Sequence, residues 1–127
     1  MIFDSDIAIW MLRKHGRALR FAEALPPRER VISAISNLEL LHGCRNQGEV
    51  IDLREFLVEW FTEITPLTPR VTEHARELME GFVLSHRPDP ADVLIATTAL
   101  ERGEPLITCN GKHFSFIPGL EVRIFRP

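Results

Sequence analysis

Apolar residues follow two patterns that alternate along the chain. Short apolar runs predict strands, and they lie at 2–4, 31–34, 64–67, 105–108 and 120–125. Longer segments between them carry apolar residues at helical spacing and predict helices at 7–11, 16–25, 37–43, 49–61, 68–82 and 91–103. Strands that alternate with helices indicate an α/β fold with a mostly parallel sheet.

Polar residues at the segment borders predict where several helices begin. Ser5 or Asp6 is suited to cap the first helix, because a short side-chain oxygen can accept a hydrogen bond from the first turn. Ser36 or Asn37 is predicted to begin the helix after the second strand, and Thr68 the helix after the third.

Prolines and glycines refine this pattern. Pro66 cannot donate to a sheet ladder, so the run 64–67 is predicted to be an edge strand. The segment 91–103 is apolar on most sides, which predicts a buried helix that ends at Gly103. Just before this segment, Asp89 lies between Pro88 and Pro90 and is predicted to be a loop residue.

Length and composition fit one globular domain over residues 1–127. The chain is 45% hydrophobic and 26% charged, and it has no repeat or low-complexity linker. A net charge of −3 at first argues against a nucleic-acid partner. However, 13 of the 15 basic residues are arginines, and an acidic total can hide a metal-binding carboxylate cluster beside a basic rim. Net charge therefore does not decide the function.

The chain carries no sign of export or of a membrane anchor. No apolar run approaches the roughly 20 residues that span a bilayer, and no basic segment precedes an apolar run at the N-terminus. Cys44 and Cys109 form neither a CxxC metal pair nor a disulfide framework. The expectation is a cytoplasmic protein without membrane contact.

Oxygen-bearing side chains fall where strands end and helices begin. Asp4 ends the first strand, and Thr108 and Asn110 lie at the end of a later one. Asp92 opens the buried helix, and Glu39, beside two leucines, is predicted to be partly buried in the first turn of its own helix. In parallel sheets the functional crevice lies outside the carboxyl ends of the strands, so these side chains can converge there.

A cluster of carboxylates needs a cation. Acids that lie close together repel, and one of them would remain protonated without a neutralising charge. Mg²⁺ or Mn²⁺ removes this penalty, since both ions prefer carboxylate and water oxygens. No His and Cys set has the spacing of a zinc site.

Four stretches give the chain a family resemblance: IFDSDIAI, SAISNLELLHG, PADVLIATTAL and LITCNGKHFSFIPGLEV. In this order and spacing they resemble the PIN-domain ribonucleases, and most of all the VapC-type toxins of toxin–antitoxin pairs. The resemblance extends from one end of the chain to the other. It implies a PIN-like fold, in which a parallel sheet is flanked by helices on both faces.

The resemblance also implies a function and assigns residues to it. It implies hydrolysis of RNA phosphodiesters by a water molecule that Mg²⁺ or Mn²⁺ activates. Asp4 and Asp92 match the acids expected to contact the metal, and Glu39 matches the glutamate that orders water or a second ion. Asn110 stands where a fourth acid is usual and brings no charge, so the presence of a second tightly bound ion stays open. Thr108 matches a hydroxyl residue that supports the acids or a phosphate.

Other positions keep two interpretations. Asp6, where the family usually has Asn, either adds charge to the site or only caps the helix, and capping is preferred. Asn110 can also serve a turn with Gly111 at positive φ. His113 is predicted to be a loop or packing residue rather than a base. Basic residues are candidates for the RNA-binding rim or simply solvated charges, namely Arg13, Lys14, Arg17 and Lys112.

The resemblance also implies partners, and two rival functions stay open beside it. Homodimers and a cognate antitoxin are expected, with the helix at 49–61 and the regions of Phe21 and Phe82 as possible contact surfaces. One alternative is a PIN-like module, degenerate at Asn110, that binds RNA or protein without cleavage. Another is an aspartyl phosphatase of the haloacid-dehalogenase type, because Asp-Ser-Asp after a strand also occurs there.

Overall fold

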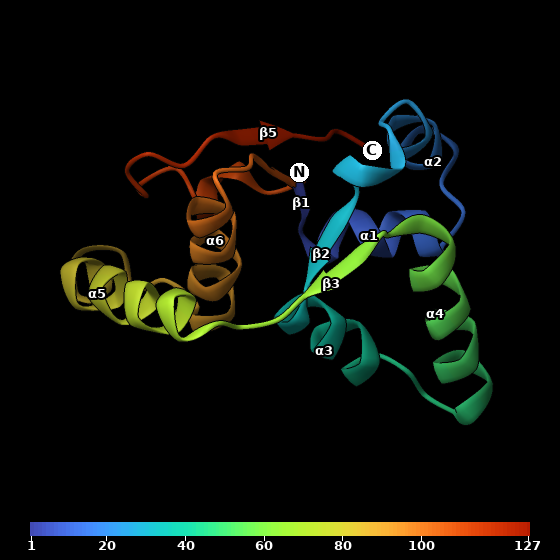
Figure 1. The fold of residues 1–127 in the computed structure, drawn as a ribbon, viewed down its shortest axis with the longest axis horizontal. Helices are drawn as coiled ribbons and strands as arrows, with labels where there is room; N and C mark the ends of the chain where they lie inside the picture. The colour runs from blue at the N-terminus through green and yellow to red at the C-terminus, as the bar shows by residue number, and fades with distance from the viewer.

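A five-stranded parallel sheet forms the centre of the computed structural model, which describes residues 1–127 (Figure 1). The strand order is β3-β2-β1-β4-β5, and every neighbouring pair is parallel. This confirms the α/β prediction and the edge position of the third strand. The strands are β1 (Ile2–Phe3), β2 (Val31–Ser33), β3 (Glu63–Thr65), β4 (Leu106–Thr108) and β5 (Val122–Ile124).

Six α-helices and two short 3₁₀ helices surround the sheet. They are α1 (Ser5–Leu12), α2 (Gly16–Glu23), η1 (Pro27–Glu29), α3 (Ala34–His42), α4 (Gln47–Trp60), α5 (Pro69–His86), α6 (Pro90–Arg102) and η2 (Gly111–His113). Figure 1 shows α5 and α6 together on one side of the strands and α4 on the other. None of these helices combines the length and hydropathy needed to cross a bilayer.

The alternation of side chains along the central strands divides the core into two layers. Successive residues of a strand point to opposite faces of the sheet. The in-register residues Phe3, Ile32 and Ile107 pack in one apolar cluster with α1, α2 and α4. Their neighbours Ile2, Val31 and Leu106 pack in a second cluster with α6 and the segment after η2. The strands are therefore buried on both faces, as continuous apolar runs predict.

Two helices begin earlier than the sequence pattern predicts. Asp4, rather than Ser5 or Asp6, caps α1, and Ser33, rather than Ser36 or Asn37, caps α3. The physical reason is the same in both cases: the last polar residue of the strand segment itself caps the helix, so no loop separates the two elements. Asp89, predicted to be a loop residue, caps α6 by accepting a hydrogen bond from Ala91 N–H.

The predicted start of α5 and the predicted end of α6 are confirmed, whereas α5 extends to His86, beyond the predicted end at residue 82. Thr68 caps α5, with Pro69 in the first helical position. Gly103 ends α6 in the left-handed conformation, with φ of 64°, which glycine adopts without steric cost. Because α6 runs antiparallel to the strands in this topology, its first turn and Asp92 lie toward the carboxyl ends of the strands.

Candidate active site

Asp4 lies at the carboxyl end of β1 and is the most buried acid of the site. Its side chain caps α1, and its Oδ1 accepts a hydrogen bond of 2.7 Å from Ser5 N–H. Only 6% of the residue is exposed. Burial, and then the neighbouring charge of Asp6, raises the pKa of the Asp4 carboxyl from 3.8 to about 7. The anionic form is therefore poorly stabilised by the protein alone.

The Thr108 hydroxyl at the end of β4 connects two carboxylates. Its Oγ lies 2.8 Å from Asp4 Oδ2 and 2.9 Å from Asp6 Oδ2, and it accepts a bond of 3.1 Å from Asn110 N–H. A hydroxyl has one proton and two lone pairs, so it can donate to only one carboxylate at a time. The hydrogen bonds are complete when Asp4 is protonated and donates to Thr108, which in turn donates to Asp6.

Asp6 belongs to this cluster, so its preferred interpretation as the helix cap is wrong. Its Oδ2 also accepts a hydrogen bond of 2.9 Å from Cys109 N–H. The cap is two residues earlier, so Asp6 lies in the first turn of α1, and its side chain contacts the end of β4. Sequence reasoning allowed for an added charge at Asp6 but could not detect the contact with Thr108, a residue 102 positions away.

Glu39 approaches the same cluster from α3. Its Oε1 accepts a hydrogen bond of 3.1 Å from Ser5 Oγ, which also lies 3.4 Å from Asp4 Oδ1. The predicted partial burial of Glu39 is wrong, because both Glu39 and Leu38 are exposed, Leu38 at 58%. Since α3 begins at Ala34, Glu39 lies in its second turn and not the first.

Asp92 is paired with His113 across the mouth of the site. Its Oδ2 lies 3.2 Å from His113 Nδ1, and His113 Nε2 lies 3.0 Å from Asn110 Nδ2. Burial raises the pKa of Asp92, while His113 opposes the rise. His113, which was predicted to be a loop or packing residue, thus contacts two of the candidate site residues. Asn110 has φ of −124°, so the alternative of a positive-φ turn is wrong.

The basic candidates lie at different distances from these acids. Lys112 belongs to η2, between Asn110 and His113, and forms no ion pair. Arg13 and Lys14 follow the last residue of α1, about 12 Å along the helix axis from the Asp4 cap. Arg17 lies in α2. Contact of any of them with RNA stays a prediction.

The donor set suits a hard divalent cation that keeps much of its water. All the acids contribute oxygen, and the buried carboxyl of Asp4 lacks a cationic partner. No three His, Cys, Asp or Glu side chains converge closely enough to form a closed metal cage. Mg²⁺ is usually bound through one or two carboxylates and several waters, so Asp4 and Asp92 together fit this ion.

Thr108 offers a test of the cluster itself. Replacing Thr108 with valine is expected to lower the free energy of unfolding by about 1–3 kcal/mol, because the Asn110 N–H and the carboxylates lose their shared partner. Thr108→Ser keeps the hydroxyl and is the matched control. Urea denaturation of both variants measures the difference, and equal stability of the valine and serine variants would show that the hydroxyl does not hold the cluster together.

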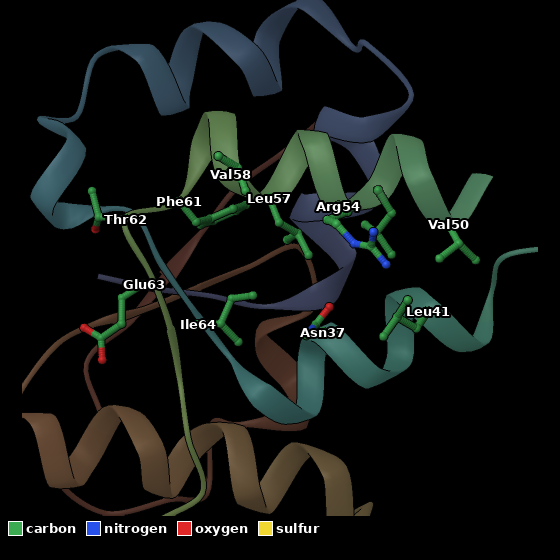
Figure 2. Close-up of a pocket in the computed structure, with 11 residues that line it drawn as sticks. Asn37, Leu41, Val50, Arg54, Leu57, Val58, Phe61, Thr62, Glu63 and Ile64 are labelled. Carbon is green, nitrogen blue, oxygen red and sulfur yellow. The ribbon is translucent and has the colours of Figure 1, made fainter. Parts of the chain in front are cut away.

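A separate groove lies between α3, α4 and β3. It has a volume of about 360 Å³ and is lined by 11 residues, of which 7 are hydrophobic. Figure 2 shows Asn37 and Leu41 of α3 facing Arg54 and Leu57 of α4. The Oδ1 atom of Asn37 is buried and has no hydrogen-bond partner. The groove contains none of the clustered acids and is a distinct feature of the surface.

Comparison with known families assigns this fold to a family. The PIN domain family matches residues 1–119, which include all of the acids described above. The chain belongs to the PIN domain family. This membership confirms the resemblance that the four sequence stretches indicated, and it leaves the dehalogenase-type alternative without support.

Relatives of this PIN domain are similar over nearly their whole length. Ribonuclease VapC19 from Mycobacterium tuberculosis is 32% identical over 125 residues, which cover 94% of this chain and 96% of that protein. VapBC-1 from nontypeable Haemophilus influenzae has a solved structure that is 28% identical, with a TM-score of 0.78 and coverage of 98% of both chains. VapBC2 from Rickettsia felis, at 24% identity and a TM-score of 0.84 over 99% of this chain and all of that one, supports the fold alone.

Proposed function

We propose that this PIN domain is an endoribonuclease that depends on Mg²⁺ or Mn²⁺ and acts as the toxin of a type II toxin–antitoxin pair. The observation that carries the proposal is the buried Asp4 carboxyl, joined through Thr108 to Asp6 at the carboxyl edge of the sheet. A buried acid with a pKa near 7 and no cationic partner is typical of a functional site. The name of the relative, Ribonuclease VapC19, points to the same activity.

The roles of the residues follow from their positions. Asp4 and Asp92 would hold the divalent cation, which, when bound, supplies Lewis acidity and lowers the pKa of water. Glu39 is exposed, and its carboxyl group shares the Ser5 hydroxyl with Asp4, so it would order the attacking water or accept its proton. Asn110 and Lys112 lie on the exposed side, where an amide and an ammonium group can contact the phosphate.

A cleavage assay on total RNA tests the proposal. Cleavage is expected in Mg²⁺ or Mn²⁺ and is expected to fall by at least about 10²-fold in excess chelator, because the acids alone cannot neutralise the transition state. The Asp92→Asn variant is expected to cleave RNA in Mn²⁺ as slowly as the wild type does in excess chelator. RNA binding without cleavage at saturating Mn²⁺ would favour the alternative of a PIN-like binding module.

The apolar groove supports the second half of the proposal, a protein partner. Several similar structures are complexes, among them a toxin–antitoxin complex from Klebsiella pneumoniae that is 26% identical, with a TM-score of 0.74 over 94% of this chain and 93% of that one. A groove between two helices suits an amphipathic segment, and Asn37 Oδ1 would accept a hydrogen bond from it. We therefore propose an antitoxin as the occupant of the groove.

Two further parts of the proposal concern assembly and compartment. A homodimer is expected from the family resemblance, and light scattering of the purified protein would measure it. Both cysteines carry free thiols, and burial raises the pKa of the Cys109 thiol to about 12, so it stays protonated at neutral pH. These features are compatible with action in the cytoplasm, which we propose as its compartment.

A further inference from the structure

Three aromatic rings form a cluster where the end of α5 meets the segment after η2. Phe82 and His86 come from the last turns of α5, and Phe116 comes from the segment after η2. The rings of His86 and Phe116 are stacked, with centroids 4.5 Å apart and an angle of 20° between their planes. Phe82 meets both rings edge-on, at 5.7 Å from His86 and 5.0 Å from Phe116.

The chain ties this aromatic cluster to Asp92 from two directions. His113 lies 3.2 Å from Asp92, and Phe116 follows it by three residues, a path of at most about 11 Å between their Cα atoms. On the other side, α5 ends at His86 and α6 begins at Pro90, with Asp92 in its first turn. The stacked pair is therefore joined by short chain segments on both sides to the acid that is proposed to hold the metal.

The His86 ring is exposed but held in a fixed orientation. Ser85 Oγ lies 2.8 Å from His86 Nδ1, and the two phenylalanine rings contact the imidazole on other sides. Phe82 and Phe116 are partly buried, and Phe116 packs against the core, which explains their position without any ligand. The core does not explain His86, because an exposed imidazole gains little from burial and loses rotamer freedom when it is fixed.

The charges around the aromatic cluster favour a nucleic-acid ligand. Arg87 follows His86 directly, is exposed and forms no ion pair, and its backbone adopts the left-handed conformation with φ of 43°. Lys112 is likewise exposed and unpaired, four residues before Phe116. Asp89 is the acid nearest in the chain, and its carboxylate is engaged in capping α6. Basic groups beside an exposed, rigid ring match the phosphates and base of a single strand.

We propose that His86, supported by Phe116, is a stacking platform for one base of a single-stranded RNA, next to the phosphate that is cleaved. This inference rests on the proposed function and extends it, because it assigns the residue on which a base next to the cleaved phosphate is held. Stacking is tolerant of base identity, so the platform positions the strand and does not by itself select a sequence.

RNA binding in the presence of a chelator tests the platform without cleavage. The probes are a fluorescein-labelled single-stranded RNA of mixed sequence and an abasic strand of the same length, and anisotropy gives the Kd of each. The His86→Ala variant is expected to bind the RNA about 5-fold to 150-fold more weakly than the wild type, the range that loss of one stacked base predicts. Its Kd for the abasic strand should equal that of the wild type.

Two further variants separate stacking from other effects. His86→Phe keeps an aromatic face without the imidazole nitrogens and is expected to bind RNA within about twofold of the wild type. Leu84→Ala changes a side chain on the same helix that is 87% exposed and should leave both Kd values unchanged. Thermal unfolding confirms that each variant is folded before binding is measured.

The outcomes distinguish this inference from the proposed function. If the wild type cleaves RNA in Mn²⁺ and His86→Ala binds RNA as tightly as the wild type, the platform is refuted and the nuclease stands. An equal loss of affinity for RNA and the abasic strand would also refute stacking, because phosphate contacts would then explain the loss. If the wild type binds RNA without cleaving it, the nuclease proposal fails and the platform is still tested by the variants. If the wild type binds neither strand in chelator, the platform is refuted, and cleavage of RNA in Mn²⁺ decides the nuclease proposal separately.

Discussion

The Asp4→Asn variant is expected to remain folded and to cleave RNA about 10³-fold or more slowly than the wild type. Asparagine is as good a helix cap as aspartate, so the bond from Ser5 N–H is kept. Its amide group can donate to Thr108 Oγ in place of the proton that Asp4 carries near its pKa of about 7. The variant therefore imitates the protonated acid, but it lacks the charge needed to hold a divalent cation.

Cleavage of RNA in Mn²⁺ and calorimetric titration with Mn²⁺ measure the two consequences of this substitution. Asp52→Asn is the matched control, since it removes an exposed aspartate of α4 and should leave both quantities at wild-type values. Full cleavage activity in Asp4→Asn would exclude Asp4 from the catalytic centre. Normal metal binding with lost cleavage would instead assign Asp4 to the chemistry and Asp92 to the ion.

The order of elements was predictable because strands and helices differ in apolar spacing. Buried strands such as β2 appear in the sequence as short, mostly apolar runs. Helices such as α5 appear as apolar residues repeated at helical spacing. Helix starts were less predictable at the ends of β1 and β2. There the strand residue Ser33, and Asp4 directly after Phe3, also serve as caps, and a sequence pattern does not show that a loop is missing.

The acids of the site were predictable from topology, but their contacts were not. The carboxyl ends of parallel strands lie at one edge of the sheet, so the pairing of β1 with β4 is sufficient to bring Asp4 near Thr108. The pairing of Asp92 with His113 depends on the turn after β4, and the exposure of Glu39 depends on where α3 begins. Both are set by tertiary packing between residues far apart in the chain, for which a single sequence carries no signal.

The raised pKa of Asp4 also predicts how pH affects the metal-free protein. The pKa is 3.8 in an unfolded chain and about 7 in the folded protein, so between these values the folded state holds a proton that the unfolded state has lost. Stability from this group is therefore lost as the pH rises through the window. The pKa of Asp92 is shifted in the same direction by burial. The pKa values of Glu49, Glu73 and Glu104 are lowered, so these groups affect the free energy of unfolding near pH 4.5 and below.

Comparison of wild type with Asp4→Asn isolates this effect. In chelator, we compare the free energy of unfolding of the wild type with that of Asp4→Asn at each pH. The difference, wild type minus variant, is expected to fall by about 2–3 kcal/mol between about pH 5 and about pH 8. Mn²⁺ at pH 8 should recover part of the loss in the wild type only, because a bound cation neutralises the ionised carboxylate. Urea denaturation at each pH gives the values, with Asp52→Asn as the control. A difference that is independent of pH would mean that Asp4 ionises normally and that the site needs no cation to hold it.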